Sequence, residues 1–173
     1  MSPAASVGRY LGKYRGTVAS NVDPMQQGRI QATVPDVLGA TPSTWAMACV
    51  PFAGTQAGIW CVPAVGAGVW MEFEQGDPER PVWSGCFWGS AADAPAPALA
   101  VPPAVSHVVI QTTGQNVISV SDAPGPAGGI MLKATSGAMV LVNEVGITIT
   151  NGSASIQLTG ATVTVNNGAL AVT

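Results

Sequence analysis

The sequence contains very little charge. Six of its 173 residues are Lys or Arg and nine are Asp or Glu, which gives a formal net charge of −3. Charged residues make up 9% of the chain, whereas an ordinary soluble domain carries about 25%. Six basic residues spread along the chain form no phosphate-binding patch, so the composition argues against nucleic acid as a partner. A monomer with so little charge also lacks the polar cover that keeps proteins soluble.

The sequence also lacks the features of disordered and helical proteins. Hydrophobic residues make up 47% of the chain, whereas disorder requires low hydrophobicity or high net charge. Glu, Lys and Arg, which dominate coiled coils and helical bundles, are scarce. The chain is instead rich in turn-forming residues, with 21 Gly and 14 Pro. This composition favours short strands joined by turns.

Long stretches have no Asp, Glu, Lys or Arg. They lie between Asp36 and Glu72, between Asp93 and Asp122, and after Glu144. Each is interrupted by prolines, glycines or alternating polar residues, so none forms the run of about 20 apolar residues that a spanning helix needs. No basic N-terminus precedes an apolar core, so we expect no secretory signal and a soluble protein synthesised in the cytoplasm.

Cysteine and histidine are also rare. The chain has Cys49, Cys61 and Cys86, an odd number without CxxC spacing, which argues against a disulfide framework or a zinc site. We expect all three to be small buried residues in a reducing compartment. A catalytic thiol would need a histidine partner, and His107 is the only one.

A proline-rich segment divides the chain. We expect an N-terminal tail over residues 1–9, a first domain over 10–90, a connector over 91–105 and a repetitive second domain over 106–173. Repeated prolines predict that the connector is extended. The five tryptophans all precede it: Trp45, Trp60, Trp70, Trp83 and Trp88.

The first domain has the pattern of a small β-barrel. Strands are predicted over residues 14–20, 28–35, 45–53, 68–74 and 80–88. In the second of them Ile30, Ala32 and Val34 alternate with polar residues, which places the three apolar side chains on one face. About five strands without helical periodicity predict a closed barrel.

The second domain is a repeat of short apolar pairs separated by Gly and Asn turns. Strands with one apolar face cannot bury it alone, whereas stacked strands form a solenoid or prism with a continuous core. Several intertwined chains would fill such a core better than one. The predicted shaft core consists of Val140, Val142, Ile147, Ile149, Ile156, Leu158, Val163, Val165, Leu170 and Val172.

A set of ordered motifs runs through the first domain. Its residues are Gly28, Arg29, Pro35, Trp45, Pro63, Gly66, Glu72, Phe73, Glu74, Gly76, Asp77, Pro78, Arg80 and Pro81. The set resembles the oligosaccharide/oligonucleotide-binding (OB) domain of phage baseplate assembly protein V and related VgrG-type spikes. The likeness covers roughly residues 10 to 90, and the repeat that follows resembles the trimeric spike of this family.

The resemblance implies an all-β protein with an N-terminal OB-fold barrel followed by an intertwined trimeric β-prism or β-helix. The homotrimer would be the non-enzymatic central spike in the baseplate of a contractile phage tail or phage-tail-like injection system. It would transmit the force of contraction and pierce the target envelope. Further expected partners are a cargo or effector and a hub protein that links the spike to the tail tube, since the chain lacks the second hub region of larger relatives.

The C-terminal end departs from the family. Some of these spikes end in a His-x-His motif that binds iron at the tip, whereas this sequence stops in mid-pattern at residues 170–173 and has no such motif. We therefore expect no metal and no cofactor. An open prism end with unpaired backbone groups predicts a separate tip protein, such as a PAAR-like cone.

Several residues have an alternative interpretation. Glu72 and Glu74 share a strand face and suit a glycan hydrolase, although carboxylates beside a turn with Arg80 as partner explain them as well. Arg29 and Arg80 are expected to form structural ion pairs rather than to bind a ligand. Three copies of His107 meeting on a trimer axis would bind an ion.

Two further alternatives concern the first domain as a whole. The tryptophans would stack bases in a protein that binds single-stranded nucleic acid. Because the sequence offers no basic groove for such binding, packing of these rings in the core and in the trimer is the better interpretation. The domain would otherwise be a polysaccharide-binding module on a β-solenoid stalk.

Overall fold

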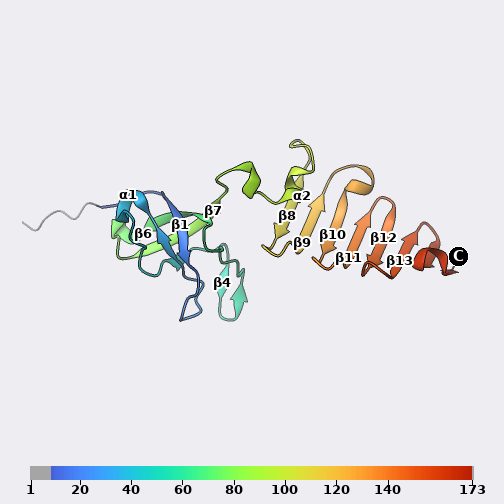
Figure 1. Ribbon diagram of the computed structural model, residues 1–173, viewed down its shortest axis with the longest axis horizontal. Coiled ribbons are helices and arrows are strands. Elements are labelled where there is room, and N and C mark those ends of the chain that lie inside the picture. Colours follow the sequence, from blue (N-terminus) through green and yellow to red (C-terminus); the bar gives the residue numbers. More distant parts are fainter. Residues whose placement is uncertain (1–8, 173) are drawn as a thin grey trace, which may run out of the picture. The chain divides into compact units, whose positions relative to one another are not determined.

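The computed structural model describes residues 9–172, and their side chains up to Leu170. Residues 1–8, which make up most of the predicted tail, lie outside the described residues, as does Thr173. Strands dominate the chain (Figure 1), which divides into two compact units between Ala91 and Ala92. This division lies at the start of the predicted connector.

The first unit is built on a five-stranded sheet with the order β2-β1-β6-β7-β3. Its strands are β1 (Tyr14–Ser20), β2 (Gln31–Thr33), β3 (Met47–Ala48), β6 (Gly68–Phe73) and β7 (Pro81–Phe87). Neighbours are antiparallel except β3 and β7, which are parallel. The remaining elements are α1 (Pro35–Leu38), the 3-10 helix η1 (Glu74–Gly76) and a hairpin of β4 (Ala53–Gly54) and β5 (Ala57–Gly58).

The core of this unit follows the predicted alternation. Ile30, Ala32 and Val34 are completely buried. On β6 the burial alternates along the strand, so that Val69 and Met71 point inward. The buried hydrophobic cluster consists of Val18, Ile30, Ala32, Val34, Ala46, Val69, Met71, Phe73 and Trp83.

The predicted strand over residues 45–53 is wrong for most of its length. Only Met47–Ala48 form a strand, and the chain then leaves the sheet for the β4–β5 hairpin. Pro51 has no backbone N–H to donate to a ladder, which is a physical reason why pairing stops before it.

The proline-rich connector also differs from the expected extended chain. It contains the 3-10 helix η2 (Ala91–Asp93) and a single-turn helix α2 (Ala96–Leu99). Proline is tolerated in the first turn of a helix because that N–H has no intrahelical acceptor. Pro97 occupies this position in α2, so the prolines here open a helical turn.

The second unit is a single eight-stranded antiparallel sheet in which each strand pairs with its neighbours in sequence (Figure 1). Its strands are β8 (His107–Gln111), β9 (Val117–Ser121), β10 (Gly129–Lys133), β11 (Met139–Asn143), β12 (Gly146–Thr150), β13 (Ser155–Thr159), β14 (Thr162–Val165) and β15 (Leu170–Val172). The 3-10 turns η3 (Gly125–Ala127) and η4 (Asn166–Gly168) connect strands. One chain therefore supplies one sheet.

Candidate functional site

The register of the second sheet lines up the apolar pairs of the repeat. Each pair lies opposite the pairs of both neighbouring strands, which gives two continuous ladders across the sheet. One ladder consists of Val108, Val120, Ile130, Val142, Ile147, Leu158, Val163 and Val172. The other consists of Ile110, Ile118, Leu132, Val140, Ile149, Ile156, Val165 and Leu170. The ladder face, as we call it, contains all ten predicted shaft-core residues.

The ladder face is exposed in a single chain. Ile110 is 61% exposed, Ile130 49% and Ile149 46%. An open groove of about 550 Å³ runs along the second ladder. Contiguous apolar surfaces of this kind mark interaction sites. The side chain of Val172 lies outside the described residues, although its backbone is opposite Val163.

The opposite face of the same sheet is polar toward its C-terminal strands. Thr148, Gln157 and Thr164 follow one another across β12, β13 and β14. Because successive side chains alternate between the two faces, the division into a ladder face and a polar face is a direct result of the sequence pattern. The apolar face therefore lacks a covering layer within its own chain.

His107 lies on the face opposite the ladders. Its Nε2 is 2.9 Å from the hydroxyl oxygen of Ser119, and its backbone pairs with Ser121. Its Nδ1 is buried without a hydrogen-bond partner in the described structure. This position does not favour the alternative in which three His107 side chains meet at a ladder-lined axis.

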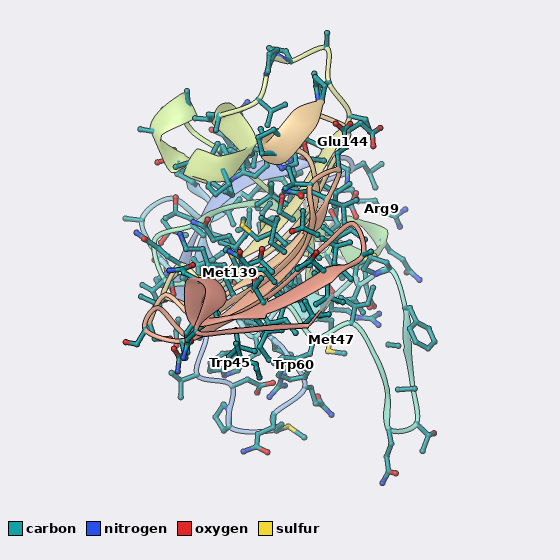
Figure 2. All side chains as sticks on the ribbon, turned by 90° about the vertical axis from the view of Figure 1, so that its right-hand side faces the viewer. Arg9, Trp45, Met47, Trp60, Met139 and Glu144 are labelled. Atoms are coloured by element: carbon teal, nitrogen blue, oxygen red, sulfur yellow. The ribbon has the colours of Figure 1, made fainter. Side chains whose placement is uncertain are left out.

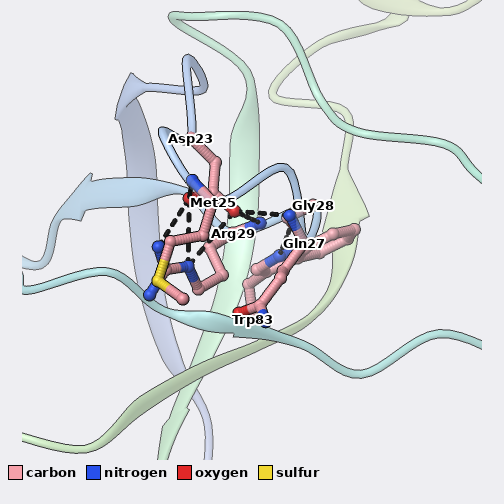
Figure 3. Close-up of polar contacts among 6 residues, drawn as sticks. All are labelled: Asp23, Met25, Gln27, Gly28, Arg29 and Trp83. Atoms are coloured by element: carbon pink, nitrogen blue, oxygen red, sulfur yellow. Dashed lines mark hydrogen bonds and ion pairs between the residues drawn. The ribbon is translucent and has the colours of Figure 1, made fainter.

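Asp23 and Arg29 organise the longest turn of the first unit (Figure 3). The Asp23 carboxylate accepts hydrogen bonds from the backbone N–H groups of Met25, Gln27 and Arg29, and the Arg29 guanidinium approaches it to 2.6 Å. Both side chains are largely buried, at 4% and 15% exposure. The hydrogen bond from Arg29 lowers the pKa of Asp23 far below its usual value, against the effect of desolvation. The same bond raises the pKa of Arg29.

Arg29 is thus a structural ion-pair residue, as predicted. Its guanidinium also lies 5.7 Å from the ring centroid of Trp45. At the same turn Trp83 donates its indole N–H to the carbonyl of Gly28 at 3.1 Å (Figure 3). The Gly28–Arg29 motif therefore fixes a turn against the buried Trp83.

Glu72 and Glu74 are both engaged by basic side chains. Lys13 approaches Glu72 to 2.6 Å and also contacts the Ser84 hydroxyl, and Arg80 pairs with Glu74. The ion-pair interpretation of Arg80 is confirmed. A glycoside hydrolase needs one carboxyl group that is free to protonate a leaving group, and these contacts give no support to that role.

The remaining motif residues shape turns and strand starts. Gly76 has a φ of +80°, and a Cβ there would lie 2.9 Å from the Tyr10 nitrogen, which donates to the Gly76 carbonyl. Pro63 accepts a hydrogen bond from the Asn21 side chain. The nitrogen of Gly66 donates to the carbonyl of Val18. These contacts connect loops that are distant in sequence.

The expectation of buried cysteines is wrong, because Cys49, Cys61 and Cys86 are all exposed. Cys49 follows β3 directly and still donates its backbone N–H to the Trp83 carbonyl at 2.9 Å, but its side chain is exposed. Partial burial raises the pKa of Cys86, with a smaller contribution from Cys61.

The tryptophans differ in their burial. The predicted packing in the core is confirmed for Trp83, which is 4% exposed. Trp60 and Trp88, in contrast, are 70% and 68% exposed. Packing of these two exposed rings in a trimer stays a prediction.

Comparison with known families assigns both units. Residues 14–88 match the Type VI secretion system/phage-baseplate injector OB domain, and residues 107–171 match the phage baseplate V C-terminal trimerisation domain. The chain belongs to the phage baseplate V spike family. The first unit of this baseplate V spike protein is therefore an OB fold. A search of curated proteins finds no significant match.

The assignment explains the ladder face of the baseplate V spike protein. A trimerisation domain supplies the missing cover from other copies of the same chain, so the protein is a homotrimer with a structural role in a baseplate. It is a component of a virion or injection particle. Within residues 9–172 no helix is long and apolar enough to span a membrane. The described residues also contain no cluster of three or more His, Cys, Asp or Glu suited to a metal ion.

Proposed function

We propose that three copies of this chain form the central spike of the baseplate. Each sheet turns its ladder face toward a common axis and forms one wall of a prism. The observation that carries the proposal is the unbroken register of the two ladders, which remain exposed in one chain. Full burial of a Val, Leu or Ile side chain is worth about 1.5–3 kcal/mol, and every strand supplies two of them.

This architecture suits a part that transmits force. Antiparallel strands hydrogen-bond to both neighbours along the meander, and packing of three sheets leaves no large apolar surface on which local unfolding can begin. On β12, β13 and β14 the outward face presents Thr, Ser and Gln and no charge. Uncharged polar side chains have a smaller desolvation cost than charged ones, which supports passage of the shaft through an envelope.

Two ends of the spike require partners. β15 is an edge strand of the described sheet, and exposed edges are templates for pairing. We assign to this edge a tip protein such as a PAAR-like cone. At the other end, a hub protein connects the OB domains to the tail tube, and the particle delivers a cargo or effector.

A pair of adjacent substitutions on β12 tests the proposal. Ile149 belongs to a ladder and Thr148 to the opposite face. Light scattering of the wild-type chain is expected to give three times its mass of 17.4 kDa. Ile149→Asp should reduce the mass to that of one chain, because it places a carboxylate in an apolar core, whereas Thr148→Asp should remain trimeric. A monomeric wild type, or equal effects of the two changes, would contradict the prism.

A second experiment tests the piercing role. Particles assembled with the Ile149→Asp chain should contract normally but fail to permeabilise target cells, and particles with Thr148→Ser, which keeps the outer face uncharged, should retain this activity. Normal killing by particles that lack a trimeric spike would exclude a role in piercing.

A further inference from the structure

Within residues 9–91 the OB unit carries an exposed arm that no other element of the unit covers. The arm comprises residues 52–60, which contain β4 and β5, and it extends away from the sheet of β1, β6 and β7 (Figure 1). Phe52, Ile59 and Trp60 are 56%, 54% and 70% exposed. A hydrogen bond from the Ile59 nitrogen to the Phe52 carbonyl closes its base. Solvent alone does not stabilise three large apolar side chains on a short hairpin.

A groove of about 630 Å³ lies between the arm and the barrel. Met47 and Trp60, both labelled in Figure 2, lie on its wall. Gln26, Gln56 and the buried Trp83 line it as well. Its lining contains no charged side chain. The lining therefore offers no cation for an anionic ligand, and its aromatic and apolar side chains suit a protein surface rich in aromatic rings, including one that carries a stacked cation.

The same unit has a second surface without a partner, centred on Arg15. The Arg15 guanidinium lies 5.0 Å from the ring centroid of Trp70 and 4.7 Å from that of Phe87. The two rings are themselves 5.0 Å apart, and Phe87 packs over Gly68. Within residues 9–172, Arg15 has no carboxylate partner. We call this cluster the Arg15 face.

The strand register shows that the two surfaces are separate. Arg15 pairs with Trp70, and the next residue of β6, Met71, pairs with Trp83. Met71 and Trp83 point into the core, so Trp70 and Arg15 point outward. The groove adjoins Trp83 and is thus on the other side of the sheet from the Arg15 face.

The occupant follows from the trimerisation domain in the same chain. Residues 92–106 separate the OB unit from β8, and a tether of this length holds the three OB units at about millimolar effective concentration. A ring of three identical units closes through a heterologous contact, in which one surface meets a different surface of the next copy. The arm and the Arg15 face are two such surfaces.

We propose that the arm of each OB unit packs on the Arg15 face of the next, so that three OB units close a ring. Trp60 covers the outer side of the Arg15 guanidinium, whose inner side already rests on Trp70 and Phe87. Stacking of an arginine on tryptophan is the favoured cation–π pair. The contact rests on the proposed trimer and adds to it an interface that does not use the ladders.

Cysteine cross-linking in the full-length chain tests the ring. Thr17 lies beside Arg15 on β1 and is opposite Gly68, and Cys61 follows Trp60 at the groove. In a Cys49→Ser, Cys86→Ser background, Thr17→Cys should form disulfides between chains when air and a copper catalyst oxidise the thiols. The expected product is a covalent trimer on a boiled, non-reducing gel. Glu79→Cys, in the exposed turn between β6 and β7, is the matched control and should leave single chains.

Two further measurements distinguish a failure of the proposed ring from a failure of the proposed spike. Trp60→Ala or Arg15→Ala should lower the yield of covalent trimer about two- to fivefold, while light scattering still gives a trimer. Single chains on the gel from a protein that is trimeric in solution would overturn the ring and leave the spike intact. A protein that is monomeric in solution would overturn both proposals.

Discussion

Ile149 and Ile156 lie directly opposite each other on β12 and β13, yet 46% and 41% of their surfaces remain exposed in one chain. Two β-branched residues in a cross-strand pair stabilise a sheet, but their exposed sides gain nothing until another sheet covers them. Assembly of the trimer and folding of the second unit are therefore expected to be coupled.

Truncation of Ile156 tests this coupling. Ile156→Ala should lower the free energy of unfolding by about 2–5 kcal/mol for each buried site, and the trimer contains three. Gln157→Ala, one residue along on the opposite face, should change it by less than about 0.5 kcal/mol. Denaturant titrations at several protein concentrations provide the measurement, and similar midpoints for both variants would contradict burial of the ladder.

The sequence alone predicted the parts of the fold that depend on local alternation. The ladder pairs and the inward row of Ile30, Ala32 and Val34 follow from a period of two residues. The predicted strand over residues 45–53 failed beyond Ala48, and its last residues, Phe52 and Ala53, belong to an exposed arm. Apolar composition does not distinguish a buried strand from an interface hairpin.

Contacts between distant strands were beyond prediction from the sequence. Nothing in the spacing of Arg15, Trp70 and Phe87 indicates that they form one cluster, because the register of β1, β6 and β7 brings them together. The sequence indicates the Asp23–Arg29 pair only weakly, through a turn that Asp23 and Pro24 begin and Gly28 ends. A carboxylate at such a position commonly accepts backbone N–H groups.

The Asp23–Arg29 pair predicts an acid sensitivity of the OB unit. The folded pKa of Asp23 is lowered, so its stabilising contribution is present above the unfolded value of about 3.9. The contribution is lost as the pH falls through the lower, folded pKa. Asp23→Asn should therefore reduce the stability of the OB unit at neutral pH. It should also weaken the dependence of that stability on pH between about pH 4 and pH 2.

Tryptophan fluorescence is a suitable measurement, because all five tryptophans lie in the first unit. Glu79→Gln, which alters an exposed carboxylate, is the control and should retain the wild-type profile. An Asp23→Asn chain with wild-type stability at pH 7 would show that the buried pair contributes nothing.

The position of Gly76 predicts that the addition of one methyl group there strongly destabilises the OB unit. A Cβ there would lie 2.9 Å from the Tyr10 nitrogen, and the φ of +80° is unfavourable for other residues. Gly76→Ala should destabilise the OB unit by about 1–3 kcal/mol. Gly54→Ala, where a Cβ would meet only the Ala57 oxygen at 4.0 Å, should have little effect. Thermal unfolding followed by tryptophan fluorescence compares the two, and equal melting temperatures would contradict strain at Gly76.

The scarcity of charge on the outer face of the shaft predicts a cost for adding it. Thr148, Gln157 and Thr164 are neighbours on this face, and lysines there carry charges that must lose water in a bilayer. A Thr148→Lys, Gln157→Lys, Thr164→Lys chain should remain trimeric but release less dye than the wild type from neutral liposomes under the same applied force. Replacement of the same residues by Ser is the matched control, since it keeps the face polar and uncharged. Because the ladder face is unchanged in both variants, a difference between them reports desolvation of the shaft surface, and equal release by the two would refute this explanation of the low charge.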